Sequence, residues 1–184
     1  AATLSRRTLL KAGGALVVAF AAPSAADAQR GVDASRAPGT LLDTASVDSY
    51  FAVHQDGSIT CYCGKVDLGQ GLRIAIRQMA AEELDVAVDR IALVEGDTAL
   101  TPDQGPTAGS SGVMRGGVQI RQAAATARAA LLTLGAQRLS RPDGELTLVD
   151  GVVKPRDGGA CVDIGALIGG RRFDVKLDPG APLK

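Results

Sequence analysis

A glycine-rich stretch around a glutamine is the part of this chain with the clearest capacity for chemistry. Residues 64–71, the glycine corner, read Gly-Lys-Val-Asp-Leu-Gly-Gln-Gly, and a helical pattern begins directly after them. Glycine allows positive φ angles and lets another molecule approach the backbone closely. The first N–H groups of a helix and its positive dipole end favour an anion, typically a phosphate. The glycine corner is therefore predicted to bind an anion.

The charges on the following helix point the same way. Arg73 and Arg77 fall in its first turns, whereas Glu82, Glu83 and Asp85 fall in its last. This order is the reverse of what the helix dipole favours, by about 0.3–1 kcal/mol for each exposed charge. A bound anion would stabilise the two arginines. The same residues also allow a plain glycine turn with two solvated arginines, because an isolated Gly-x-Gly turn is a weak signal.

A second glycine-rich stretch carries hydroxyl side chains. Residues 96–117 contain six glycines and two prolines, and an irregular loop of that length in a compact domain is typically functional or misassigned. Thr107, Ser110 and Ser111 add hydroxyl groups to flexible backbone N–H groups, and Arg115 adds a cation. The stretch is predicted to be a second anion cradle. A mobile surface loop is the alternative.

Composition and cysteine spacing argue against several other functions. The chain has 20 basic and 20 acidic residues, no Trp and few other aromatic residues, so nucleic-acid binding is not expected. No Cys-x-x-Cys pair and no histidine at ligand spacing occur, so zinc or iron–sulfur ligation by this chain is not expected. Cys61, Cys63 and Cys161 are predicted to be small buried hydrophobes, with a disulfide from Cys161 left open. His54 is predicted to be a solvated strand residue.

The hydrophobic periodicity predicts elements that would position both glycine-rich stretches. Two alternating runs flank an Asp-Gly hairpin turn, and later apolar stripes recur at helical spacing. The expected strands are residues 49–54, 58–63, 91–95, a hairpin at 144–154 and 171–176; the expected helices are residues 72–86, 118–139 and a short one from Asp163 to 168. A hairpin, a helix and a third strand form the skeleton of a two-layer α/β domain.

Residues 1–28 are expected to be a twin-arginine export signal. Arg6 and Arg7 lie in Ser-Arg-Arg-Thr-Leu-Leu-Lys, and a short apolar stretch and a small-residue cleavage site follow. The apolar stretch is shorter than the ~20 residues of a spanning helix, so no stable membrane span is expected. The chain is therefore expected in the periplasm. An amphipathic helix or an uncleaved anchoring helix is the alternative. Residues 29–46 are expected to be a linker.

The same motifs resemble a known family. Val66-Asp-Leu-Gly-Gln-Gly71 is similar to the V-E/D-x-G-Q-G segment of the molybdopterin-binding subunit in the xanthine dehydrogenase and aldehyde oxidase family, in the branch of the isoquinoline 1-oxidoreductase β subunit. The resemblance continues, in the family's order, through Ala80-Ala-Glu-Glu-Leu-Asp-Val86, Gly96-Asp-Thr-Ala-Leu-Thr-Pro-Asp-Gln104 and Thr107-Ala-Gly-Ser110. It implies a partial molybdopterin-binding domain over residues 47–178, followed by a tail at 179–184.

The resemblance also implies a fold and a chemistry. The fold is α/β (α+β), a two-layer sandwich in which β-hairpins and a mixed sheet pack against two main helices. The cofactor is molybdopterin, with a dinucleotide form left open. Its own sulfurs hold the molybdenum, so the protein binds and orients it. The family hydroxylates a small N-heterocycle or aldehyde with water-derived oxygen and passes electrons to a 2Fe–2S small subunit.

The resemblance assigns roles to particular residues. Gln70 corresponds to a glutamine whose amide hydrogen-bonds an oxygen ligand of molybdenum, since an amide can donate without adding charge. Gly69 and Gly71 would leave room for the cofactor. The residues expected near the pterin end or supporting the site are Thr107, Gly109, Ser110 and Ser111.

The departures from the family limit what this chain is expected to do. The family's catalytic glutamate lies in a Gly-Glu-Pro-type motif far downstream, and Glu82, Glu83, Glu95 and Asp97 do not match it. We therefore expect the N-terminal portion of the molybdopterin-binding subunit, inactive alone, with the remainder of that subunit as a partner. The alternative is a non-catalytic exported binding module that has kept the fold and lost the cofactor.

Overall fold

A three-stranded mixed sheet forms the centre of the domain. The computed structural model describes residues 42–184, so the predicted export signal and most of the predicted linker lie outside the described part. Strands β1 (Phe51–Val53) and β2 (Ile59–Cys63) form the predicted hairpin, and β3 (Ile91–Glu95) pairs with β2 in parallel. The sheet order is β1-β2-β3.

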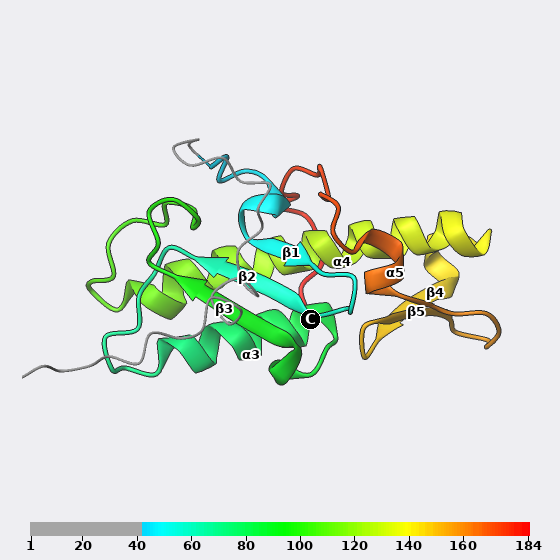
Figure 1. Ribbon diagram of the computed structural model, residues 1–184, viewed down its shortest axis with the longest axis horizontal. Helices are drawn as coiled ribbons and strands as arrows, with labels where there is room; N and C mark the ends of the chain where they lie inside the picture. The colour runs from blue at the N-terminus through cyan, green and yellow to red at the C-terminus, as the bar shows by residue number, and fades with distance from the viewer. Residues whose placement is uncertain (1–41) are drawn as a thin grey trace, which may run out of the picture. The chain divides into compact units, whose positions relative to one another are not determined.

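Two long helices cover this sheet. Helix α3 (Leu72–Leu84) connects the parallel strands β2 and β3, as such a crossover requires, and α4 (Val118–Leu139) packs beside it (Figure 1). Leu72, Ile76 and Ala80 form a buried stripe at helical spacing on α3, in line with the predicted apolar periodicity. The predicted two-layer α/β fold, with two main helices and a mixed sheet, is confirmed.

A second, smaller sheet lies near the C-terminal end of α4, away from the glycine-rich loops (Figure 1). It contains β4 (Leu146–Val149), β5 (Val152–Pro155) and β6 (Val162–Asp163), all antiparallel. The short helix α5 (Ile164–Ile168) begins where predicted, because Asp163 Oδ1 accepts a hydrogen bond from Gly165 N at 2.7 Å. Short 3₁₀ turns complete the fold: η2 (Val47–Ser49), η3 (Val88–Arg90) and η5 (Asp143–Glu145).

The second glycine-rich stretch is shorter than predicted. Its irregular part ends at Ser111, and Gly112–Gly117 form a π-helix, η4, that continues directly into α4. Glycine is a poor helix former, which is why the sequence indicated a loop there. Close packing explains its presence, because a Cβ on Gly116 would lie 2.6 Å from Lys65 Cγ.

One prediction for the C-terminal part differs from the structure. Residues 171–176 do not form a strand; a single bridge joins Ser46 to Lys176. The Asp48 carboxylate instead accepts hydrogen bonds from the backbone N–H groups of Phe173 (2.7 Å) and Asp174 (2.9 Å). The N–H groups of these two residues thus donate to a side chain rather than to the carbonyl groups of a neighbouring strand.

Buried charge joins α3 to α4. Glu83 is fully buried, and its carboxylate accepts hydrogen bonds from Arg121 Nε (2.8 Å) and Arg128 Nη1 (3.0 Å). Arg121 and Arg128 therefore do not form a solvated face of α4, because the carboxylate from the neighbouring helix draws them inward. Residues 179–184, predicted to be a tail, lie against this cluster, and Lys184 N donates to Glu83 Oε2 at 3.1 Å.

The cysteines follow the prediction only in part. Cys61 and Cys63 are buried on β2, but Cys161 is exposed, and all three are free thiols. Burial raises the pKa of Cys63 to about 11 and that of Cys61 well above its ordinary value, so both remain neutral at ordinary pH. Within residues 42–184, no helix is both long and apolar enough to cross a membrane.

Candidate functional site

The glycine corner leads from the end of β2 to the start of α3, and Asp67 organises it. Asp67 Oδ1 accepts hydrogen bonds from Gly69 N (2.8 Å) and Gly71 N (3.3 Å), and Oδ2 accepts one from Arg73 N (3.0 Å). The hydrogen bond from Arg73 N, followed by that from Gly69 N, lowers the pKa of Asp67. A carboxylate of the chain itself therefore occupies the position at the helix start where an external anion was predicted.

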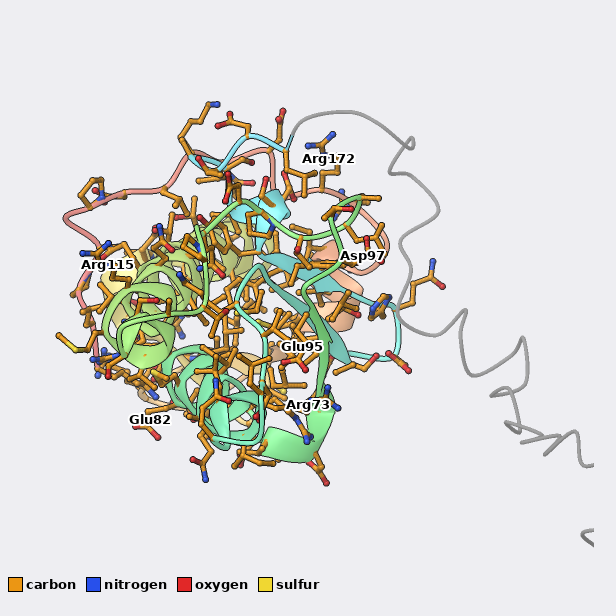
Figure 2. All side chains as sticks on the ribbon, turned by 90° about the vertical axis from the view of Figure 1, so that its left-hand side faces the viewer. Arg73, Glu82, Glu95, Asp97, Arg115 and Arg172 are labelled. Carbon is orange, nitrogen blue, oxygen red and sulfur yellow. The ribbon has the colours of Figure 1, made fainter. Side chains whose placement is uncertain are left out.

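Both arginines at the start of α3 also have partners within the chain. Arg73 pairs with Glu95 at the end of β3, and Arg77 donates to the carbonyl oxygens of Ile91 and Val88, each at 2.8 Å. Figure 2, viewed toward the glycine-rich loops, shows Arg73 close to Glu95 and Arg115 well apart, on the side of α4. The position of Arg73 and Arg77 therefore does not require a bound anion, contrary to the expectation from the dipole.

Gln70 is exposed at the turn of the glycine corner, where it bends back on its own loop. Its Oε1 accepts a hydrogen bond from Leu68 N at 2.5 Å, and its Nε2 donates to Val66 O at 3.1 Å. Gly69 and Gly71 on either side have φ angles of +101° and +78°, and a Cβ at Gly71 would meet nothing within 4 Å. An amide nitrogen carries two hydrogens, so the second Nε2 hydrogen of Gln70 can be donated to a ligand.

We call residues 104–111 the hydroxyl loop. This loop is hydrogen-bonded to the glycine corner, although about 40 residues separate the two in the sequence. Gln104 Oε1 accepts a hydrogen bond from Gly64 N at 2.8 Å, and its Nε2 donates to Gln119 Oε1 on α4 at 2.8 Å. Thr107 Oγ1 accepts one from Val66 N at 2.9 Å. The two stretches that the sequence singled out separately thus form one structural unit.

Lys65 is the residue of this unit that the sequence reasoning missed. Its side chain is only 1% exposed, and Nζ donates to Gly105 O (3.1 Å), Pro106 O (2.7 Å) and Ser111 Oγ (3.3 Å). Lysine is rarely buried in proteins, and all of its partners lie far away in the sequence. The only feature of the sequence that could have identified Lys65 was its position inside the glycine motif, next to the end of β2.

A cavity of about 610 Å³ lies between the glycine corner, the start of α3, the hydroxyl loop and η4. Five of the predicted site residues line it: Gln70, Gly71, Thr107, Ser110 and Ser111. Gly69 and Gly109 are chain neighbours of these lining residues but do not line the cavity themselves. The apolar side chains of Leu68, Val113 and Met114, all exposed, also contribute to the wall.

The chemistry of this cavity is that of binding. Its polar groups are hydroxyls, an amide and backbone groups. Within residues 42–184, no group of three or more His, Cys, Asp or Glu side chains could hold a metal ion. His54 contacts Thr60 Oγ1 at 2.8 Å and does not line the cavity. Such a site suits a polar prosthetic group that brings its own metal ligands, because neutral donors can orient the group without coordinating its metal.

Comparison with known sequences agrees with this geometry. Residues 20–173 match the family described as the molybdopterin cofactor-binding domain. The chain is 38% identical over 135 residues to one of the subunits of nicotinate dehydrogenase from Pseudomonas putida, covering 73% of this chain and 11% of that protein. It is 31% identical over 174 residues to the β subunit of isoquinoline 1-oxidoreductase from Brevundimonas diminuta, covering 90% of this chain and 22% of that protein. The chain therefore spans less than a quarter of each of these relatives.

Solved structures support the fold. The carbon monoxide dehydrogenase of Oligotropha carboxidovorans is similar with a TM-score of 0.58 and 24% sequence identity, over 64% of this chain and 15% of that one. Quinoline 2-oxidoreductase from Pseudomonas putida 86 also gives a TM-score of 0.58, with 22% identity, over 72% of this chain and 17% of that one. At these identities the likeness establishes the fold alone.

Proposed function

This chain belongs to the molybdopterin cofactor-binding domain family, and we propose that it supplies one wall of the cofactor site in the molybdenum-binding subunit of a molybdenum hydroxylase. The observation that carries the proposal is the cavity in which Gln70 and Gly71 line one side and Thr107, Ser110 and Ser111 another. When bound, the cofactor would supply the redox chemistry that hydroxylates an N-heterocycle or aldehyde. The protein residues in this chain would bind and orient it.

Each wall of the cavity would contribute a distinct interaction. The second amide hydrogen of Gln70 would be donated toward an oxygen near the metal, which adds no charge at that position. The hydroxyls of Thr107, Ser110 and Ser111 would accept or donate hydrogen bonds at the pterin end. Gly71 would allow close approach, since a Cβ there meets nothing within 4 Å. Asp67 would hold the backbone of the glycine corner in place before the cofactor arrives.

The remaining parts of the proposal concern other polypeptides and the location. Because this chain spans 11% to 22% of the relatives above, we propose that the rest of the molybdenum-binding polypeptide supplies the catalytic glutamate and most of the substrate contacts. The electrons would leave through a 2Fe–2S small subunit. We further propose export to the periplasm, supported by Arg6 and Arg7 in the N-terminal motif.

Replacing Gln70 tests the proposed function. We expect Gln70→Ala, introduced in the complete subunit and expressed with its partners, to lower turnover or alter the molybdenum centre, because an oriented amide donor is lost. Molybdenum content, turnover and metal spectroscopy would be measured. Gln137→Ala is the matched control, since Gln137 is exposed near the far end of α4. Unchanged turnover together with an unchanged metal spectrum in Gln70→Ala would reject the assignment.

One observation favours a second candidate, a non-catalytic binding module that has lost the cofactor. Gln70 already bonds to Val66 O and Leu68 N, and Asp67 already occupies the start of α3, so the corner is satisfied without a ligand. Metal analysis separates the two candidates. Molybdenum in the chain purified after co-expression with the rest of the subunit supports the enzyme component, whereas its absence with and without co-expression supports the module.

A further inference from the structure

The buried lysine of the glycine corner connects the two walls of the cavity. Lys65 lies three residues before Leu68, where the wall formed by the glycine corner begins. Its ammonium group donates to Gly105 O, Pro106 O and Ser111 Oγ of the hydroxyl loop, and Ser111 lines the opposite wall. Three acceptors match the three hydrogens of an ammonium group. The separation of the walls is therefore set in part by the length of one side chain.

The aliphatic stem of Lys65 is held in place by packing, just as its ammonium group is held by hydrogen bonds. A Cβ on Gly116 would lie 2.6 Å from Lys65 Cγ, so the stem passes directly against the backbone of η4. Ser111 Oγ, besides contacting Lys65, donates to Pro106 O at 3.0 Å. The ammonium group is thus part of a small hydrogen-bonded cluster behind the cavity surface, and it fixes the hydroxyl loop from the inside.

The charge of Lys65 is not neutralised by a neighbouring carboxylate. Among residues 42–184, the partners of its Nζ are carbonyl and hydroxyl oxygens, and the ion pairs in that part of the chain involve other residues. A buried ammonium is tolerated only with such complete hydrogen bonding. Its positive potential would act on Ser111, which lines the cavity, and would favour an anionic group of the ligand there.

From these contacts we propose that Lys65 is a positioning residue of the site. It holds the hydroxyl loop against the glycine corner and places a positive charge behind the Ser111 wall. The part that concerns the molybdenum cofactor rests on the proposed function, whereas the part that concerns the loop does not. Lys65 would act through the loop rather than touch the metal.

The loop can be tested in the purified full chain without any cofactor. Amide hydrogen exchange of Ala108 and Ser111 is followed by NMR in the wild type and in Lys65→Met, which keeps the apolar stem and removes the charge and donors. We expect both amides to exchange roughly tenfold faster, while the amides of α3 and α4 keep their protection. Lys154→Met, at an exposed position on β5, is the matched control and should change neither. Unchanged exchange in Lys65→Met would overturn the proposal.

A conservative variant separates positioning from general stability. Lys65→Arg keeps the charge, but its branched guanidinium does not suit three acceptors grouped around one nitrogen. We expect about threefold faster exchange of Ala108 and Ser111, and this variant carries the test alone if Lys65→Met does not fold. Exchange in Lys65→Arg that matches the wild type would count against a fitted ammonium site.

Cofactor content then tests the link to function. In the complete subunit with its partners, Lys65→Met should retain roughly tenfold less molybdenum than the wild type, and Lys65→Arg should recover part of that loss. Wild-type protein without molybdenum would reject the proposed function, while the exchange data would still decide whether Lys65 fixes the loop. Full molybdenum content in Lys65→Met would overturn its role toward the cofactor.

Discussion

The two ends of helix α3 are built in opposite ways. At its C-terminal end, Glu83 is fully buried and meets two arginines of α4. At its N-terminal end, the chain exposes apolar side chains beside a cavity, with Leu68 74% and Met114 73% exposed. A buried carboxylate paired with two arginines closes one end, and apolar side chains are left in contact with solvent at the other. Exposed apolar side chains around a cavity are typical of a binding surface.

This contrast indicates that the C-terminal end of α3 contributes mainly to stability and that its N-terminal end contributes mainly to binding. At the C-terminal end of α3, the buried carboxylate of Glu83 is paired with arginines of the same chain, which stabilises the contact between α3 and α4. At the N-terminal end, Asp67 accepts hydrogen bonds from backbone N–H groups of the glycine corner and of Arg73, while Lys65 donates to the hydroxyl loop. Open space remains between the two walls that these side chains hold. Single substitutions can therefore test each region separately. Their expected effects on the free energy of unfolding range from a large loss to almost none.

The largest effect is expected at the buried carboxylate. Glu83→Ala should destabilise the protein by about 3–5 kcal/mol, because it leaves Arg121 and Arg128 with uncompensated charge between the helices. Urea denaturation would measure the free energy of unfolding. Glu82→Ala, one position earlier and exposed, should change it by less than about 0.5 kcal/mol. Similar losses for both variants would show that the Glu83 cluster is not specially stabilising.

A smaller loss of stability is expected from a substitution where η4 packs against Lys65. Gly116→Ala should cost about 1–3 kcal/mol through overpacking against the lysine stem, measured by urea denaturation. Gly144→Ala, whose added Cβ would meet nothing within 4 Å, should change stability little. In a Lys65→Ala background the cost of Gly116→Ala should shrink, because the atom it collides with is gone. An equal cost in both backgrounds would refute this contact.

The glycine corner should depend on pH through Asp67. Its pKa is lowered in the folded chain, so the stabilisation it gives is complete above the unfolded-state pKa and is lost as the pH falls through the folded-state pKa. The amide resonances of Gly69 and Arg73 should therefore shift together at acidic pH, below the ordinary range of an aspartate. In Asp67→Asn this shared transition should vanish. Its persistence in that variant would assign the titration to another group.

The smallest effect on stability is expected at the cavity mouth. Met114→Ser should change the free energy of unfolding by no more than about 0.5 kcal/mol, since the side chain is largely exposed. Thermal unfolding would measure it, with the buried Ile76→Ser on α3 as the contrasting variant. A large loss in Met114→Ser would mean that this end of the domain contributes to folding as the other does.

The sequence predicted the elements better than the contacts between them. Periodicity located β3 at residues 91–95 and α4 at 118–139, because burial of one helix stripe or one strand leaves a local pattern. Family resemblance selected Gln70 and the Thr107 to Ser111 stretch, most of which line one cavity. Their roles toward the cofactor remain predictions.

What the sequence did not reveal depends on distant partners. The Glu83 cluster joins residues 38 and 45 positions apart, and Lys65 reaches the hydroxyl loop across 40 or more. Such contacts leave no periodic trace. The helix dipole predicted an external anion at the start of α3, but Asp67, four residues before the N-cap, turns back and fills the same place.

The π-helix at the start of α4 has a consequence for how this domain tolerates change in length. A π turn accommodates one more residue than an α turn over the same rise. Deleting a single residue from Gly112–Gly117 could therefore convert the segment to ordinary α-helix while Ile120, Leu131 and the rest of the α4 core face stay in register. Natural insertions and deletions at this point would reshape the binding wall and leave the hydrophobic core untouched.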